Sequence, residues 1–252
     1  MIKELFQYAK FRKKWYLLPL IFALIIFPFY GTALAAIAPD AATNGGSTTA
    51  TSLTFAATAT TTANSIMLFE VTGNNVLAND YISGAAFNGD AATIVKKYYA
   101  RGRWRYAFEL KNPDAGTHNV VISASASTFI RANVVTYTGV DQTTNPEVSA
   151  TSTQPANINE AVSINTITDN AWVVLFAFAH SVSAGVDTTL RVNNTGDAIL
   201  DSGGPVSPAG SKTLNAVDDE GLSEWANIIM VLKPAAEAPV AADVSRSRLI
   251  LW

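Results

Sequence analysis

The sequence predicts an all-β protein: a two-sheet antiparallel β-sandwich of the jelly-roll or Greek-key type, preceded by an N-terminal signal or anchor helix. Between residues 36 and 234, short runs of alternating apolar and polar residues are separated by Gly, Asn, Asp and Pro. This is the pattern of strands and turns. The same region shows no sustained helical period with caps, so almost no helix is expected in it. A basic segment followed by an apolar one precedes it.

Residues 1–35 are typical of an export segment. Five basic residues and one Glu come first, no charge occurs between Lys14 and Asp40, and Ala33-Leu34-Ala35 is a small-x-small cleavage pattern. These are the three parts of a secretory signal, and the apolar run is also long enough to span a bilayer. We expect a signal peptide or a membrane anchor that places the body at the cell surface or outside the cell. The cleavage pattern favours the signal peptide, and only an uncleaved segment would contact the membrane.

The opening "KELFQYAKFRKKWYLLPL" resembles the start of a family of very short, single-pass bacterial membrane proteins. The resemblance covers fewer than forty residues. It implies an anchor rather than a cleaved signal.

Each strand of the body is expected from its own run of residues. "TSLTFAATATTTANSIMLFEV" and "THNVVISASAS" alternate, whereas "RANVVTYTGV" and "AWVVLFAFAH" are almost continuously apolar, as in central strands buried on both faces. "NEAVSINTI", "TLRVNN" and "WANIIMVLKP" complete the set. Because an open sheet would expose its edges and one apolar face, two packed sheets are expected. Residues 235–252 are rich in Ala and Pro, which predicts a tail or linker.

The composition excludes several classes of protein. Without the six charged residues before Ala36, the chain has 12 basic and 19 acidic residues. An acidic body argues against nucleic-acid binding, which depends on neutralising phosphates. The chain has no Cys, so disulfides and Cys-based zinc sites are excluded. The body must therefore fold on its hydrophobic core alone.

Several phrases of the body, taken in order, resemble exported bacterial β-sandwich modules found on cell-surface and secreted proteins. They are "AIAPDAATNGGSTTATSLTF", "AAFNGDAATIV", "LKNPDAGTHNVVISASAS", "VVTYTGVDQTTNPEVSA" and "WANIIMVLKPA". The resemblance covers the body from Ala36 to Pro234. It implies a fold and a compartment, and it carries no catalytic motif.

The stretch "KKYYARGRWRY" holds five of the seventeen basic residues and four aromatic ones. With Arg101-Gly102 as a two-residue loop, a hairpin follows in which Tyr99 faces Trp104. Lys97 then faces Tyr106 and Val95 faces Phe108. One face would turn aromatic and apolar side chains to the core: Trp104, Tyr106, Phe108 and Leu110.

The other face of this hairpin would turn its side chains to water: Lys96, Tyr98, Arg103 and Arg105. One interpretation is that its cations only keep the hairpin soluble. The alternative is a patch that recognises anionic polymers of the cell envelope or extracellular polysaccharide, through Arg–aromatic contacts.

A second candidate site is the acidic turn "AVDDEGLSEW", which holds Asp218, Asp219, Glu220 and Glu224. Carboxylates at this density can hold calcium, the one cofactor that the sequence offers, although the spacing matches no known calcium loop. The segment "TGVDQTTNP" around Asp141 fits a turn better, because Asp and Asn bond their own backbone.

No catalytic motif is found. His118 and His180 are the only imidazoles, and neither accompanies a nucleophile elbow or a zinc motif. Glu70 and Glu109 are the one pair of carboxylates considered for glycoside hydrolysis. We therefore expect a non-enzymatic protein.

Three functions are weighed. The first, which we favour, is a secreted or cell-surface β-sandwich with a structural, adhesive or glycan-contacting role. The second is a dedicated carbohydrate-binding module, which would turn Trp172 or Trp225 outward. The third is a jelly-roll enzyme that acts on glycans, with two carboxylates in a groove.

Overall fold

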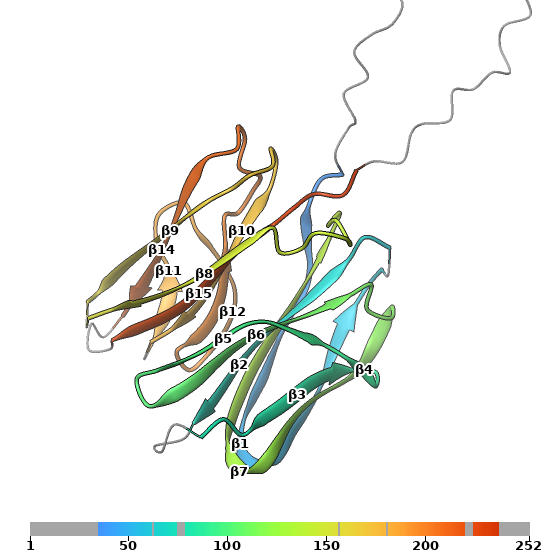
Figure 1. Cartoon of the computed structure of the whole chain (residues 1–252), viewed down its shortest axis with the longest axis vertical. Helices are drawn as coiled ribbons and strands as arrows, with labels where there is room; N and C mark the ends of the chain where they lie inside the picture. The colour runs from blue at the N-terminus through green and yellow to red at the C-terminus, as the bar shows by residue number, and fades with distance from the viewer. Residues whose placement is uncertain are drawn as a thin grey trace, which may run out of the picture. The chain divides into compact units, whose positions relative to one another are not determined.

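The computed structural model describes residues 35–61, 63–74, 79–155, 157–179, 181–219 and 224–236. These residues form fifteen strands and no helix, which confirms the all-β class (Figure 1). Consequently, no helix among the described residues is suited to cross a membrane. The predicted N-terminal helix and the predicted tail beyond residue 236 lie outside the described residues. The compact unit runs from Leu34 to Ala236, against a predicted body of 36–234.

The fifteen strands are β1 (Ala38–Ala59), β2 (Ile66–Asn74), β3 (Ile82–Phe87), β4 (Asp90–Ala91), β5 (Thr93–Ala100), β6 (Arg103–Lys111), β7 (Gly116–Thr138), β8 (Val148–Gln154), β9 (Asn159–Asn165), β10 (Trp172–Phe178), β11 (Val182–Ala184), β12 (Thr189–Asn194), β13 (Asp197–Asp201), β14 (Ser211–Asp218) and β15 (Trp225–Leu232).

The strands pair into three antiparallel sheets, whereas two were expected. The first sheet has the order β4-β3-β7-β2-β6-β5, with β1 also paired to β7. The second has the order β12-β13-β10-β15-β8, and the third is β11-β14-β9. The third sheet was not expected. Its short strands show the same apolar–polar alternation as the other strands, and their pairing partners are distant in sequence.

The second sheet is buried on both faces. Alternate residues of β10 face opposite ways: Trp172, Val174 and Phe176 share a hydrophobic cluster with residues of the first sheet. Val173 and Leu175 share another with the third sheet. Every residue of β10 and of β15 is buried. This confirms the prediction that the continuously apolar run in "AWVVLFAFAH" forms a central strand.

The first sheet is also covered on two sides near β2 and β6, because the long strand β7 serves two regions. Its first part pairs with β3, from Val120 to Ala124, and its last part pairs with β2, from Phe129 to Tyr137. Residues of β2 and β6 such as Phe69 and Phe108 pack in one cluster with Ile122 and Phe87. The opposite side of β2 and β6 faces the second sheet, where Leu68 and Ala107 belong to the shared cluster.

The β5–β6 hairpin forms in the predicted register. Tyr99 pairs with Trp104, Tyr98 with Arg105 and Lys97 with Tyr106. Arg101 and Gly102 both have positive φ, 55° and 71°, as a type I′ turn requires. The register shifts between Ile94 and Lys96, so Ile94 faces Phe108 instead of the predicted Val95. A β-bulge of this kind inserts one residue and has no clear sequence signal.

The two ends of the described body lie side by side (Figure 1). The backbone N–H of Ala35 donates to the carbonyl of Ala235 at 2.7 Å, and the N–H of Ala235 donates to Gly139 at 2.8 Å.

Candidate functional site

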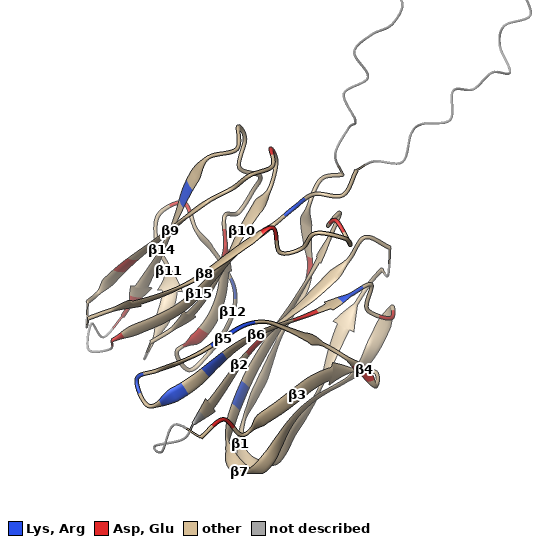
Figure 2. Cartoon of the chain, viewed as in Figure 1, with Lys and Arg blue, Asp and Glu red and all other residues tan. Residues whose placement is uncertain are grey.

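The β5–β6 hairpin carries a concentration of basic residues at its tip and along β6 (Figure 2). Because side chains alternate across a strand, the hairpin has two faces. We call one the Trp104 face, formed by Lys97, Tyr99, Trp104 and Tyr106. We call the other the Arg105 face, formed by Lys96, Tyr98, Arg103 and Arg105.

On the Trp104 face, four rings follow one another from the surface into the core. The ring centroids of Tyr99 and Trp104 are 5.6 Å apart, those of Trp104 and Tyr106 are 6.2 Å apart, and those of Tyr106 and Phe108 are 5.7 Å apart. Phe108 and Tyr106 are fully buried, Trp104 is half-buried and Tyr99 is 37% exposed. The outer end of this row of rings is therefore open to solvent, although Trp104 was predicted to face the core together with Tyr106 and Phe108.

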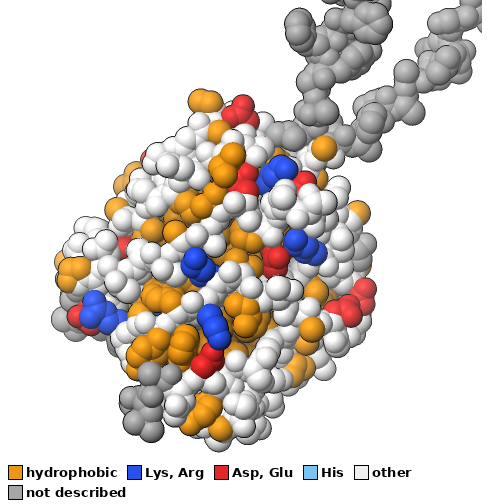
Figure 3. Space-filling model, viewed as in Figure 1, with side chains coloured by type: hydrophobic (Ala, Val, Ile, Leu, Met, Phe, Trp, Pro, Cys, Tyr) orange, Lys and Arg blue, Asp and Glu red, His pale blue; other side chains and the backbone are white. Residues whose placement is uncertain are grey.

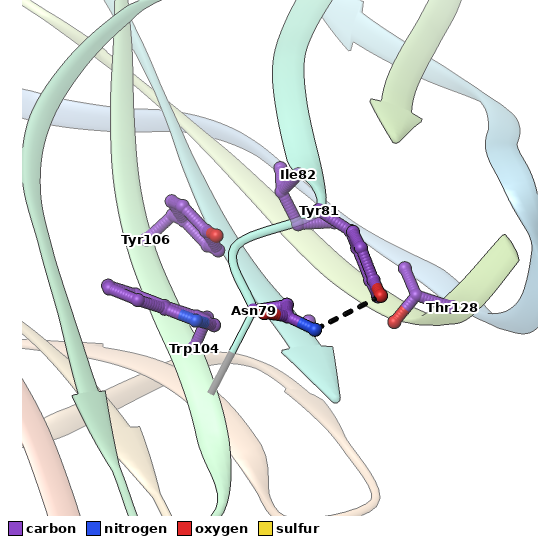
Figure 4. A pocket seen from close by; sticks show the side chains of 7 residues that line it. Asn79, Tyr81, Ile82, Trp104, Tyr106 and Thr128 are labelled. Atoms are coloured by element: carbon purple, nitrogen blue, oxygen red, sulfur yellow. Dashed lines mark hydrogen bonds between the residues drawn. The ribbon is translucent and has the colours of Figure 1, made fainter. Parts of the chain in front are cut away.

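A small pocket lies beside the row of rings (Figure 4). The empty space between its lining residues is about 140 Å³, open solvent included, so it is a shallow hollow. Ring edges of Trp104 and Tyr106 border one side, and the polar groups of Asn79, Tyr81 and Thr128 border the other. The Asn79 amide donates to the Tyr81 hydroxyl at 3.3 Å. The lining residues are Gly73, Asn79, Tyr81, Ile82, Trp104, Tyr106 and Thr128, and none carries a carboxylate.

The charge on the Trp104 face is largely compensated. The Lys97 ammonium lies 5.6 Å from the Trp104 ring centroid and donates to the Asp80 carboxylate at 2.7 Å. The Tyr106 hydroxyl donates to the other Asp80 oxygen. Burial and this donation to a carboxylate both raise the pKa of Tyr106. The face therefore offers an aromatic surface beside an ion pair rather than an isolated cation.

The Arg105 face was predicted to lie in water, and this prediction was wrong for Arg105 itself. Arg105 is only 5% exposed, since the second sheet covers it. Its guanidinium lies 4.4 Å from the ring centroid of Phe178 in β10, and its Nη1 donates to Thr72 Oγ1 at 2.7 Å. Burial lowers the pKa of Arg105, and the nearby carboxylate of Asp197 opposes this.

Tyr98 shares this enclosed position. Its ring packs against the cluster between the first two sheets, and its hydroxyl donates to the Ser152 carbonyl of β8 at 3.0 Å. Burial raises its pKa. Lys96 and Arg103 are half-exposed, and the Arg103 guanidinium lies 5.9 Å from the Phe129 ring centroid. The proposed anionic-polymer patch of Lys96, Tyr98, Arg103 and Arg105 thus retains only two side chains within reach of a polymer.

The hairpin tip and the acidic turn, two separate candidates in the sequence, meet in the fold. Arg101 Nη1 lies 2.5 Å from Glu224 Oε2. Figure 3 shows the basic side chains on this view of the molecule as separate spots among apolar and polar atoms. A continuous basic surface is not formed on that face.

The calcium candidates are dispersed. Asp218 is buried, whereas Asp219 accepts hydrogen bonds from Ser183 at 2.8 Å and Ser181 at 3.3 Å. Glu224 pairs with Arg101, and Glu220 lies outside the described residues. Among the residues that the structure describes, no three His, Cys, Asp or Glu side chains gather as metal ligands.

The segment around Asp141 forms the predicted turn. Asp141 Oδ1 accepts hydrogen bonds from the backbone N–H groups of Thr143 and Thr144, both at 2.8 Å. Burial opposes ionisation of Asp141, but these bonds outweigh it and lower its pKa to about 2. The carboxylate therefore stabilises the turn.

The remaining candidates from the sequence are the two histidines, Trp172 and Trp225. His118 packs edge-on against Phe87 at 5.4 Å, and its Nε2 lies 3.1 Å from the Ala115 carbonyl, whereas His180 lies outside the described residues. Trp172 is 5% exposed and Trp225 is fully buried. Neither tryptophan offers the outward platform that a carbohydrate-binding module would need from it.

Glu70 and Glu109 do not form a catalytic pair in a groove. Glu70 is 1% exposed and receives a hydrogen bond from Asn133, between the first two sheets. Glu109 is 9% exposed and lies 3.7 Å from Lys111. Burial raises the pKa of Glu109, and Lys111 opposes the shift.

The sequence alone did not reveal the pocket. Asn79 and Tyr81 precede β3, and Thr128 lies in the middle of β7, so only tertiary packing brings them to Trp104. The single available signal was the clustering of Tyr99, Trp104 and Tyr106, which marked the hairpin but not its open side.

Comparison with known proteins adds little to this site. A family of unknown function, DUF5989, matches residues 1–38, which leaves nearly all of the strands outside the match. No curated protein matches the chain. Among solved structures, an anti-sigma factor domain-containing protein aligns over 73% of this chain and 76% of its own, with 7% identity and a TM-score of 0.21. A TM-score this low supports no statement about fold or function.

Proposed function

We propose that the chain is an exported, non-catalytic protein of the β-sandwich type that contacts a glycan through the Trp104 face. The observation that carries the proposal is the pocket, where aromatic ring edges of Trp104 and Tyr106 lie opposite the polar groups of Asn79, Tyr81 and Thr128. Sugars present apolar C–H groups beside hydroxyls, so they match a surface that offers rings with a few placed polar groups.

The size and charge of the pocket narrow the class of glycan. Its empty space of about 140 Å³, which includes open solvent, is below the roughly 300–1,000 Å³ of ordinary ligand pockets, so a sugar unit would lie against its rim rather than inside it. Because Lys97 is paired with Asp80 at 2.7 Å, the face favours an uncharged sugar over a polyanion. A neutral cell-envelope or extracellular polysaccharide is therefore the partner proposed.

The non-catalytic and sandwich parts of the proposal have their own support. Glu70 is enclosed between sheets and is not within a groove. The sheets share hydrophobic clusters in pairs, as packed sheets of a sandwich do. Export is supported by the basic, apolar and small-residue parts of residues 1–35.

The test is binding of the full-length chain to a panel of immobilised neutral and acidic polysaccharides. Trp104→Ala should weaken retention on a neutral polysaccharide by about tenfold, which corresponds to about 1.4 kcal/mol. Thr128→Val should weaken it less, because one polar contact is lost. Retention should change little with salt, since contact with ring edges and uncharged polar groups is not ionic.

Ile94→Ala is the matched control, because Ile94 is an exposed apolar residue on the same hairpin and does not line the pocket. It should bind as the unaltered chain does. Equal retention of the Trp104→Ala and Ile94→Ala variants, or retention only on acidic polymers and only at low salt, would refute the neutral-glycan proposal.

Export is tested separately by sequencing the N-terminus of the protein recovered from the membrane and from the medium. A new N-terminus near Ala36 in the medium supports a cleaved signal, and an intact Met1 in the membrane supports an anchor. Retention of the whole chain in the cytoplasm would contradict export.

A further inference from the structure

The third sheet ends in an edge strand, β9, that pairs with β14 alone among the described strands. Two hydrogen bonds at its ends fix the pattern of the ladder. The Asp218 N–H donates to the Ile158 carbonyl at 2.8 Å, and the Thr166 N–H donates to the Gly210 carbonyl at 2.9 Å. Because hydrogen-bonded pairs alternate along an antiparallel ladder, the even-numbered residues of β9 bond to β14. The odd-numbered residues turn their backbone N–H and C=O groups to the outer edge.

The outer edge of β9 offers a regular row of backbone groups. Those of Asn159 are capped by Asn157, whose Nδ2 donates to the Asn159 carbonyl at 2.7 Å. The N–H and C=O groups of Ala161, Ser163 and Asn165 have no such cap among the described residues. They lie two residues apart, which is the spacing that an added strand requires.

Other edge strands of the fold are interrupted or covered. β5 and β12 each contain a β-bulge. On β8, the carbonyls of Ser152 and Gln154 accept hydrogen bonds from Tyr98 and Arg101 of the hairpin. β9 keeps one register over its seven residues and contains no Pro. It therefore lacks several of the devices by which natural edge strands avoid pairing.

The one charged residue of β9 does not oppose pairing. Glu160 points to the inner face of the sheet, where it is 2% exposed and accepts a hydrogen bond from Asn227 at 2.9 Å. An inward charge protects an edge when a new strand would bury it without a partner. Glu160 is buried and bonded before any strand is added.

The outer face beside this edge carries small, uncharged side chains. On β9 and β14 they are Asn159, Ala161, Ser163, Asn165, Ser211 and Thr213. The hydroxyl oxygens of Ser163 and Thr213 lie 2.7 Å apart. Neither a like charge nor a bulky group on this face would therefore repel an approaching strand.

β9 is complementary to itself when two copies run antiparallel about Ser163. Ser163 then faces Ser163 of the second copy and Ala161 faces Asn165, so the edge groups of all three residues are used. On the inner face, Val162 meets Ile164 of the second copy. Both residues belong to the hydrophobic cluster between the second and third sheets, so pairing makes this cluster continuous with its counterpart.

Two exposed apolar side chains flank the same edge. Ile158 and Ile167, which are 56% and 69% exposed, lie just before and just after β9. In the antiparallel register about Ser163, Ile158 of one copy comes next to Ile167 of the other at both ends of the paired strands. Pairing therefore shelters apolar surface that a single chain leaves in water.

We propose that β9 pairs antiparallel with β9 of a second copy of this chain, with Ser163 at the two-fold axis, so that the third sheets of the two copies form one continuous sheet. A contact made by one short strand is small, so the dimer is weak and reversible, as are contacts below roughly 1,200 Å². No residue of β9 lines the pocket beside Trp104. The pairing is therefore independent of the glycan contact.

The direct test uses a single introduced thiol, since the chain contains no Cys. Ser163→Cys in the full-length chain should form a disulfide between copies in oxidised glutathione. Facing residues of a hydrogen-bonded pair have Cα atoms about 5.5 Å apart, and a disulfide spans roughly 4.4–6.8 Å between Cα atoms.

Ser211→Cys is the matched control, because Ser211 is exposed on β14, and the two β9 strands would separate it from its counterpart. On a non-reducing gel, cross-linked dimer should dominate for Ser163→Cys and be a trace for Ser211→Cys. Equal cross-linking of the two variants, or none in either, overturns the proposal.

Ser163→Lys tests the pairing without a cross-link. It places two ammonium groups opposite each other at the two-fold axis, whereas Ser211→Lys keeps them apart. In sedimentation velocity of the full-length chain up to about 1 mM, where weak dimers form, the unaltered chain and Ser211→Lys should show a dimer that grows with concentration. Ser163→Lys should lose it.

A dimer that persists in Ser163→Lys would come from another part of the chain, and it overturns the proposal, as does a monomer of the unaltered chain at every concentration. If Ser163→Lys does not fold, the comparison of the two Cys variants decides.

Discussion

The two faces of the β5–β6 hairpin carry similar residues in different surroundings. On the Arg105 face, Tyr98 packs against the second sheet and donates to Ser152 at 3.0 Å. On the Trp104 face, the neighbouring Tyr99 is 37% exposed and packs on the Trp104 ring at 5.6 Å. Composition alone does not separate the two tyrosines. The second sheet separates them. It covers Tyr98 on the Arg105 face, and it leaves Tyr99, at the outer end of the Trp104 face, open to solvent.

The comparison shows that one basic and aromatic stretch can serve two purposes, because successive side chains of a strand point to opposite faces. One face packs in the core and the other meets solvent. Arg105 is one residue beyond Trp104, yet it lies between sheets, over Phe178. Buried arginines of this kind stabilise a fold only when they remain paired. The partly exposed rings are the part of the stretch available to a ligand.

The largest expected effect is on the buried side. Arg105→Ala should lower the free energy of unfolding by about 3–5 kcal/mol, because it leaves Asp197 with one fewer buried partner. It also removes the contact with Phe178. Urea unfolding of the full-length chain near neutral pH, followed by tryptophan fluorescence, measures this loss.

Arg103→Ala is the matched control for this change, since Arg103 lies on the same face of β6 and is half-exposed. Its loss should stay within about 1 kcal/mol. Equal losses for Arg103→Ala and Arg105→Ala would contradict the distinction between covered and open parts of the Arg105 face.

The next effect depends on pH and concerns Glu160 of β9. It is 2% exposed, Asn227 donates to it at 2.9 Å, and burial raises its pKa to about 7. Between pH 4.5 and 7 the unfolded chain ionises Glu160 while the folded chain keeps its proton, so the folded state binds more protons. Stability should therefore fall as the pH rises through this window, by roughly 1–3 kcal/mol at about 1.4 kcal/mol for each pKa unit, and stay constant above it.

Glu160→Gln should remove this part of the pH dependence while keeping the acceptor for Asn227. Near pH 4 the free energy of unfolding of the variant should equal that of the unaltered chain. As the pH rises from 5 to 7, the variant should become the more stable of the two. Parallel curves for the two proteins would show that Glu160 is not held protonated. Glu70 and Glu109 also have raised pKa values, so they too make stability fall as the pH rises. Both proteins contain them, so their contribution cancels when the two stability curves are subtracted.

A smaller effect compares the two tyrosines directly. Tyr98→Phe removes a hydrogen bond to the Ser152 carbonyl and should cost about 1 kcal/mol. Tyr99→Phe keeps the ring contact with Trp104 and should cost less than about 0.5 kcal/mol. Urea midpoints of the two variants decide the order, and a larger loss for Tyr99→Phe would reverse the assignment of covered and open faces.

The smallest effect is expected at the hairpin tip. The side chains of Arg101 and Glu224 are 38% and 49% exposed, and ion pairs this exposed contribute about 0.2–1 kcal/mol. A double-mutant cycle with Arg101→Ala and Glu224→Ala should give a coupling in this range that shrinks as salt is added. A coupling well above 1 kcal/mol would mean that the pair of Arg101 and Glu224 holds the hairpin tip to the second sheet more strongly than expected for side chains this exposed.

The sequence predicted what depends on local chemistry. The Arg101-Gly102 turn fixed the pairing of Tyr99 with Trp104, and the turn at Asp141 followed from its neighbouring hydrogen-bond donors. The apolar run at β10 predicted a strand buried on both faces. Each of these features is decided within a few residues.

The features that the sequence missed depend on distant parts of the chain. Arg105 is covered by β10 and β13, more than seventy residues away, and β9, β11 and β14 form a third sheet. The bulge at Val95 has no marker of its own. Thr128 reaches the pocket because β7 is long enough to pair with β3 and β2 in turn. Alternation predicts that a face exists but not which element will cover it.

The most direct test of the proposed binding face is fluorine NMR of the full-length chain labelled with fluorotryptophan, with the Trp104 resonance assigned from Trp104→Phe. Adding the neutral polysaccharide that the chain retains best should shift the Trp104 resonance and leave those of the buried Trp172 and Trp225 in place. Binding that leaves the Trp104 resonance unmoved, or the lack of binding to any polysaccharide, would contradict the account.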